Sequence, residues 1–238
     1  MKNIDTSDLL QTGATAIVHA SHYIEQLRNA LKQLVCPNDA IENELLETHQ
    51  FALHGFAWSA TYLEALLAIQ NWAEQLEQKG NFTALEALIY LSGQGAYLSQ
   101  LINGIAMSQD EVFRPIDLDM EDAAFTLASN SKVAYLLKNG NSIQTRLKIV
   151  KLAKVGLQTG SFGNIAEDEE TTIIRDQFRR FAEESIVPYA HSWHQNDELI
   201  PLEIIEVLGE LGVFGICIPE EFDGLGLGKV ALSVVTEE

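Results

Sequence analysis

Residues 218–226 have the sequence Ile218-Pro219-Glu220-Glu221-Phe222-Asp223-Gly224-Leu225-Gly226, followed by Leu227-Gly228-Lys229. Glycines at alternate positions behind a proline indicate a turn. A phosphate-binding loop would need glycine at position 223 and serine or threonine at position 230, where the chain has Asp223 and Val230. A dinucleotide fingerprint would need glycine at position 229, which is lysine. We therefore interpret the stretch as a connector that leads into a helix.

Helical patterns lie on both sides of this turn. Upstream, apolar residues recur at helical spacing, at Ile174, Phe178, Phe181, Ala182, Ile204, Ile205, Leu208 and Leu211. Pro188 is expected to kink or restart a helix, and Pro201 suits a helix start. The segment 213–219 is expected to be a buried turn. A last apolar helix begins near Lys229 and reaches Glu238, so we expect the natural chain to continue into an element that covers it.

The first 158 residues have the pattern of an antiparallel helical bundle. Capping residues precede an apolar stripe up to Leu34, and the pattern predicts further helices over 40–79, 83–102, 121–137 and 143–157. No stretch alternates apolar and polar residues as a half-buried strand would. Aromatic residues of the second segment are expected in the bundle core: Phe51, Phe56, Trp58, Tyr62 and Trp72. The fold class predicted is all-α.

A glycine-rich stretch separates this bundle from the C-terminal part. Residues 156–164 contain three glycines with polar neighbours, and the acidic run 167–170 follows. Such a composition is typical of a linker. We expect a helical extension over 1–158, a linker over 159–168 and a second helical domain over 169–238.

Charge and composition exclude several classes of protein. The 238 residues include 15 Lys+Arg and 34 Asp+Glu, for a formal net charge of −19. Such an excess of acid opposes binding to nucleic acid or to an anionic membrane. The N-terminus has no apolar run typical of a secretory signal, and two distant cysteines make no disulfide framework. These features favour a cytoplasmic protein.

The side chains that could carry chemistry form no complete site in the sequence. The six histidines come in three pairs, His19/His22, His49/His54 and His191/His194, with no third ligand nearby. No serine lies in a nucleophile-elbow pattern. Glu220 and Glu221 are adjacent, so their side chains diverge and favour capping or solvent. The sequence therefore predicts no catalytic, cofactor-binding or metal-binding residue in this chain.

Residues 169–238 nevertheless resemble a known family. The motifs are residues 175–182 (RDQFRRFA), 186–190 (IVPYA), 211–216 (LGVFGI) and the turn 218–226. In this order they are similar to the N-terminal α-helical domain of the acyl-CoA dehydrogenase family, whose turn has glycine where this chain has Asp223. Motifs before residue 158, among them 50–58 (QFALHGFAW) and 60–65 (ATYLEA), resemble the extension of one branch that oxidises a branched C5 acyl-CoA.

The resemblance implies a parent enzyme that uses FAD. In such an enzyme a glutamate removes the α-proton of an acyl-CoA while the β-hydride passes to the flavin, and an electron-transfer flavoprotein reoxidises it. The glutamate and most FAD contacts would lie beyond Glu238, so this fragment is expected to be inactive alone. The resemblance also implies a homo-oligomer, with residues 214–227 as one wall of the acyl cavity.

Two alternatives remain open from the sequence. A stand-alone acidic helical interaction module would also fit the bundle-like first part. A general acyl-CoA dehydrogenase with another substrate would fit the motifs of the second part.

Overall fold

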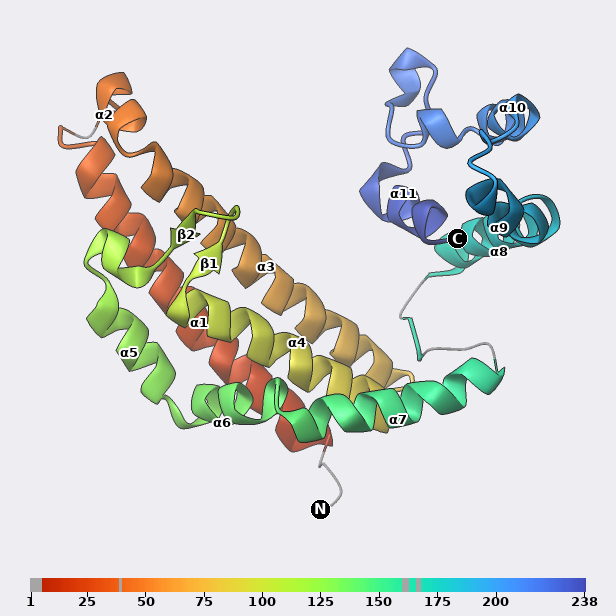
Figure 1. Ribbon diagram of the computed structural model, residues 1–238. Helices are drawn as coiled ribbons and strands as arrows, with labels where there is room; N and C mark the ends of the chain where they lie inside the picture. The colour runs from red at the N-terminus through yellow and green to blue at the C-terminus, as the bar shows by residue number, and fades with distance from the viewer. Residues whose placement is uncertain (1–5, 39, 160–162, 166–167) are drawn as a thin grey trace. The chain divides into compact units, whose positions relative to one another are not determined.

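The computed structural model describes residues 6–38, 40–159, 163–165 and 168–238. The chain forms two compact units, Met1–Ala166 (unit 1) and Glu167–Glu238 (unit 2). Helices account for nearly all of the regular structure, which confirms the all-α prediction (Figure 1). The expected linker 159–168 includes residues 160–162, 166 and 167, which lie outside the described residues.

Three long helices form the centre of unit 1. They are α1 (Thr6–Val35), α3 (Gln50–Gln78) and α4 (Ala84–Asn103), and each packs on the other two. The short helix α2 (Asn43–Thr48) joins α1 to α3 at one end (Figure 1). Apolar residues of α1 predicted from the stripe, such as Leu27 and Leu31, are buried. The aromatic side chains of α3 lie mostly at the rim of this core: Phe56, Trp58, Tyr62 and Trp72 are half-buried and Phe51 is 38% exposed.

A short β-ribbon follows α4, which the strand-free prediction missed. Its strands β1 (Ile105–Ala106) and β2 (Val112–Phe113) pair antiparallel, with Ile105 opposite Phe113. Two residues per strand are too few to show alternation in a sequence. The ribbon aims the Phe113 ring at α3, where a Cβ on Gly55 would lie 2.1 Å from the ring carbon Cγ. A glycine at position 55 is therefore required by the close approach.

The remaining helices of unit 1 pack on α1 and α4. After the 3₁₀ turn η1 (Pro115–Leu118) come α5 (Glu121–Ser129), α6 (Ser131–Gly140) and α7 (Ile143–Thr159). The single helix expected over 121–137 is wrong. Asn130 interrupts it, because its backbone is extended and its side-chain oxygen accepts hydrogen bonds from the N–H groups of Lys132 and Val133.

The crossing of α4 and α6 is unusually close. A Cβ on Gly95 would lie 2.7 Å from the carbonyl oxygen of Leu136 and 2.8 Å from Cα of Gly140. Gly140 meets α4 in the same way, with the Leu91 carbonyl oxygen 2.6 Å from a Cβ there. Both glycines therefore let the two backbones touch.

Buried hydrogen bonds join the elements of unit 1 at two places. Tyr90 donates its hydroxyl proton to Gln70, whose amide donates to the carbonyl of Leu10 at 3.3 Å. Burial raises the pKa of the Tyr90 hydroxyl, which therefore stays a neutral donor. At the start of α4, Glu86 is 1% exposed and accepts from Thr83 and from Asn164. The second contact fixes residue 164 to the bundle.

Unit 2 has four helices among its described residues. They are α8 (Glu169–Ser185), α9 (Val187–Gln195), α10 (Leu202–Glu210) and α11 (Gly228–Glu237), with 3₁₀ turns η2 (Val213–Gly215) and η3 (Glu220–Phe222) before α11. The side chain of Asp168 caps α8 by accepting from the N–H of Thr171 at 2.8 Å. As the prolines predicted, α9 begins afresh around Pro188 and α10 begins after Pro201.

Candidate functional site

The turn between α10 and α11 is held in shape by its own backbone. The N–H groups of Leu225, Gly226 and Leu227 donate to the carbonyls of Gly215, Ile218 and Ile216, each at 2.9 Å. Gly224 sits so close to Ile218 that a Cβ there would lie 2.0 Å from its carbonyl oxygen. Residues 215–227 therefore form a doubled-back loop rather than a loose connector.

This turn presents apolar side chains to solvent. Phe214 is 64% and Phe222 69% exposed, whereas Ile216 is buried. The expectation of a buried turn over 213–219 is therefore wrong for most of its residues. The tight backbone turns one apolar side chain inward and leaves the others outward. A rigid loop with exposed aromatic rings is suited to contact an apolar ligand or another protein surface.

Asp223 occupies the position where the family motif has glycine. Its φ is +60°, in the left-handed region that favours glycine. Aspartate tolerates this region better than most residues do, and the N–H of Asp223 still donates to the Glu220 carbonyl at 3.0 Å. The departure from the motif is therefore accommodated by the turn.

An ion cluster ties α8 to the end of α11. The buried Arg175 donates to Glu238 and, at 2.9 Å, to Glu237. Arg179 donates through Nε and Nη2 to Glu238 at 2.8 and 2.7 Å. These hydrogen bonds, from Arg179 first, outweigh burial and lower the pKa of Glu238. This cluster was not predicted from the sequence. Only its two arginines, four residues apart on one helix, could be recognised there.

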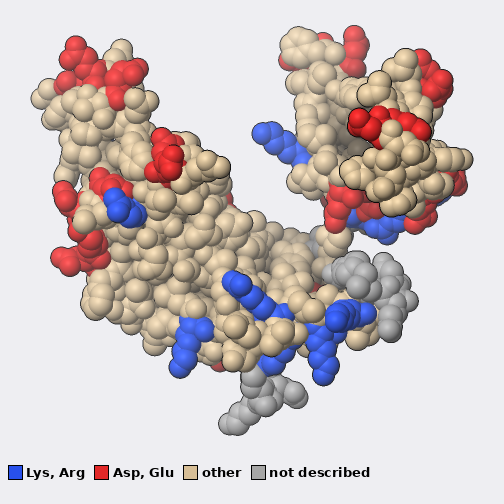
Figure 2. Space-filling model, in the orientation of Figure 1, with Lys and Arg blue, Asp and Glu red and all other residues tan. Residues whose placement is uncertain are grey.

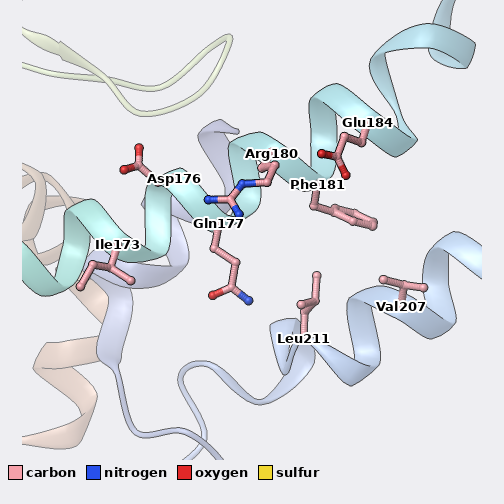
Figure 3. A pocket seen from close by; sticks show the side chains of 8 residues that line it. All are labelled: Ile173, Asp176, Gln177, Arg180, Phe181, Glu184, Val207 and Leu211. Carbon is pink, nitrogen blue, oxygen red and sulfur yellow. The ribbon is translucent and has the colours of Figure 1, made fainter.

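An open groove of about 580 Å³ lies between α8 and α10 (Figure 3). Ile173, Phe181, Val207 and Leu211 give it apolar walls. Asp176, Arg180 and Glu184 of α8 also line it. Two carboxylates beside one guanidinium leave the groove net negative, which disfavours a phosphorylated ligand.

The described residues alone do not fit FAD, the cofactor that the family resemblance implies. A flavin dinucleotide carries a pyrophosphate, and the α8–α10 groove would present it with Asp176 and Glu184. In the glycine-rich turn, the N–H groups of Leu225, Gly226 and Leu227 donate hydrogen bonds to carbonyls of the turn itself. We therefore assign no step of flavin chemistry to this chain.

The other residues singled out in the sequence are the histidine pairs and the adjacent glutamates. Among the described residues, no three His, Cys, Asp or Glu side chains gather as a metal site requires. His54 accepts from the Trp58 indole N–H at 3.0 Å, and His19 lies 2.9 Å from the amide of Asn130. Glu220 and Glu221 are exposed in η3. No helix of the described chain is long and apolar enough to span a bilayer.

The geometry of unit 2 agrees with its sequence relationships. The family model "Acyl-CoA dehydrogenase, N-terminal domain" matches residues 168–238. Unit 2 is therefore similar in sequence to that domain over its whole described length. This confirms the resemblance that the motifs of residues 175–226 indicated.

Whole-chain similarity extends the relationship to unit 1. The (2S)-methylsuccinyl-CoA dehydrogenase of Cereibacter sphaeroides is 43% identical over 231 residues, which are 97% of this chain and 41% of that protein. Glutaryl-CoA dehydrogenase of Desulfococcus multivorans is 38% identical over 72 residues, 29% of this chain and 18% of that protein. Short-chain specific acyl-CoA dehydrogenase of Rattus norvegicus is 36% identical over 70 residues, 29% of this chain and 17% of that protein. The chain thus spans less than half the length of these curated relatives.

Proposed function

We propose that this chain is the N-terminal part of a flavin-dependent dehydrogenase that oxidises (2S)-methylsuccinyl-CoA to mesaconyl-CoA. The observation that carries the proposal is the 43% identity over 97% of the chain, which extends over both units. A family resemblance in unit 2 alone would leave the substrate open. The match through unit 1 also favours a dehydrogenase over a stand-alone interaction module.

In this proposal unit 2 supplies one wall of the acyl cavity. Its rigid turn presents Phe214 and Phe222, and uncharged rings there would exclude water from the thioester end of the substrate. The base and the hydride acceptor would come from the parts of the parent protein outside this chain. FAD, the acyl-CoA and an electron-transfer flavoprotein would be partners of that whole cytoplasmic protein.

The test uses the protein as its source cells make it. We expect that protein to reduce an artificial electron acceptor with (2S)-methylsuccinyl-CoA at a higher kcat/KM than with glutaryl-CoA or isobutyryl-CoA. Faster oxidation of either competitor would overturn the substrate assignment. It would leave the family assignment of unit 2 in place.

The 238-residue chain by itself gives a second readout. Because its groove is net negative and its turn is self-bonded, we expect it to purify without flavin and to reduce no acceptor. Stoichiometric flavin bound to this chain would show that its own residues hold the cofactor, contrary to the proposal.

A further inference from the structure

Helix α7 exposes apolar side chains on its solvent side. Ile143, Leu147 and Val150 are 70%, 65% and 51% exposed, whereas Thr145 on the opposite side is buried. Spacings of four and three residues place the three apolar residues on one line along a helix, and Lys154 continues that line. We call Ile143, Leu147, Val150 and Lys154 the α7 seam. A line of this kind is typical of a helix that docks on another surface.

The seam belongs to a basic segment of an otherwise acidic chain. Residues 123–166 contain no Asp or Glu and six Lys or Arg, although the whole chain has a net charge of −19. Lys132 lies 3.5 Å from the Asp8 carboxylate, while Lys151 and Lys154 are exposed on α7. Figure 2 shows Lys and Arg gathered over α6 and α7.

The residues just before this segment have the opposite charge. Residues 110–122 contain six acidic side chains and one basic, Arg114, which pairs with Asp117 at 3.3 Å. The large apolar side chains of Ile116 and Phe125, 55% and 73% exposed, lie within residues 110–122 and just after them in the sequence. The acidic patch, as we define it, consists of these two and five exposed carboxylates, Asp110, Glu111, Asp119, Glu121 and Asp122.

We propose that the α7 seam docks on the acidic patch of a second copy of this chain. Each surface combines exposed apolar side chains with charges of one sign, and the signs are opposite. Every copy carries both surfaces in unit 1, so a two-fold axis would close two equivalent contacts. The inference does not depend on which acyl-CoA the parent enzyme oxidises.

A membrane surface fits the seam less well than a second copy does. A basic amphipathic helix can lie on anionic lipid. Here, however, the seam has three aliphatic residues and no aromatic one, and the acidic remainder of the chain would be repelled by the same lipid. The acidic patch of a second copy offers the α7 seam charges of the opposite sign without this repulsion from lipid.

The first measurement is sedimentation velocity of the 238-residue chain over a range of concentrations. At about 0.15 M salt, interactions between exposed charges more than about 8 Å apart are largely screened. We expect a reversible monomer–dimer equilibrium. A chain that stays monomeric at every concentration, or that grows into open polymers, would overturn the proposal.

Charge exchange tests which surfaces meet. Lys151→Glu with Lys154→Glu should weaken dimerisation at least about tenfold, because like charges then face each other. Glu121→Lys with Asp122→Lys should do the same. All four changes together should restore the dimer toward its original affinity. Two pairs of changes that each unfolded the protein could not together restore the dimer. If the fourfold variant does not dimerise, the pairing of the α7 seam with the acidic patch is refuted.

Matched variants separate the seam from general charge effects. Leu147→Asp should abolish the dimer and Leu147→Met should retain it, since this side chain contributes little to the monomer core. Glu203→Lys with Glu206→Lys changes the exposed face of α10 by the same charge and should leave the dimer intact. A monomeric protein that instead co-sediments with anionic phosphatidylserine vesicles through Lys151 and Lys154 would replace the second copy by a lipid surface.

Discussion

Replacing Glu86 by glutamine keeps the size of the side chain and changes one carboxylate oxygen to an amino group. In the structure Oε2 accepts from the backbone N–H of Thr83 at 3.1 Å and from its hydroxyl. Oε1 accepts from the backbone N–H and the side-chain amide of Asn164, at 2.8 and 3.0 Å. All four partners donate in the structure, and three of them are N–H groups that cannot accept, so the new amino group faces at least one N–H donor whichever way the amide lies.

The loss can be worked out from these contacts. Hydrogen bonds to a charged group contribute about 1.5–3 kcal/mol each, and Glu86→Gln removes one or two of the four and weakens the others. Glutamine is easier to bury than a carboxylate, which offsets part of the loss. We expect the free energy of unfolding of unit 1 to fall by about 3 kcal/mol at neutral pH.

The effect should depend on pH in a definite direction. Burial of Glu86 opposes its ionisation, but hydrogen bonds from Thr83, from the backbone N–H of Glu86 and from Asn164 outweigh burial and lower its pKa. Ionised Glu86 therefore stabilises the fold above its unfolded pKa of about 4.3, and this contribution is lost as the pH falls through the lower folded pKa. Glutamine cannot take up that proton, so the two proteins should converge in stability in acid.

Urea unfolding followed by circular dichroism, at neutral pH and at several acidic values, measures both quantities. Glu64→Gln is the matched control, because Glu64 is exposed on α3, and it should change stability by less than about 0.5 kcal/mol. The reasoning is refuted if Glu86→Gln costs no more than the control. It is also refuted if its cost is the same at every pH.

Four glycine-related changes give further tests by the same unfolding measurement. Gly95→Ala should lower the free energy of unfolding by about 1–3 kcal/mol, because the new methyl meets backbone atoms of α6. Gly93→Ala should lower it less, because its methyl meets only the flexible end of a side chain. Equal losses from the two variants would contradict the packing argument. Gly224→Ala should destabilise unit 2, since its methyl would lie 2.0 Å from the Ile218 carbonyl oxygen, and an unchanged midpoint would argue against this turn. Asp223→Gly should change stability by no more than about 1 kcal/mol, because relief of the left-handed backbone opposes the added freedom of the unfolded chain; a larger loss would reveal a role for its carboxylate.

Helix boundaries were predictable where the capping chemistry is local. Thr83 and Glu86 form the capping box that starts α4, and Pro201 precedes α10. Asn130 was harder, because an asparagine within an apolar pattern splits a helix only if its side chain turns back to cap the next one. The β-ribbon was missed because its pairing is set by the fit of Phe113 against Gly55, which are far apart in sequence.

The candidate site shows the same division. The turn at residues 218–226 could be recognised from its motif, because glycine spacing is a local signal. Its exposure could not, since an apolar run such as 213–218 has the same composition whether it faces a core or solvent. The pairing of Arg175 with Glu238 joins residues 63 positions apart and depends on how α8 meets α11.

The two units differ in how much apolar surface they bury, and this bears on how the protein is made. Unit 1 has a continuous core, whereas the buried apolar residues described in unit 2 are Phe178, Ala182, Ile216, Ala231 and Val234. A ribosome releases unit 1 first, so its core can form while unit 2 is still being synthesised. Unit 2 then emerges beside a neighbour that is already folded, with its aromatic turn still uncovered. At that stage the nascent chain is most prone to aggregate and to be bound by chaperones.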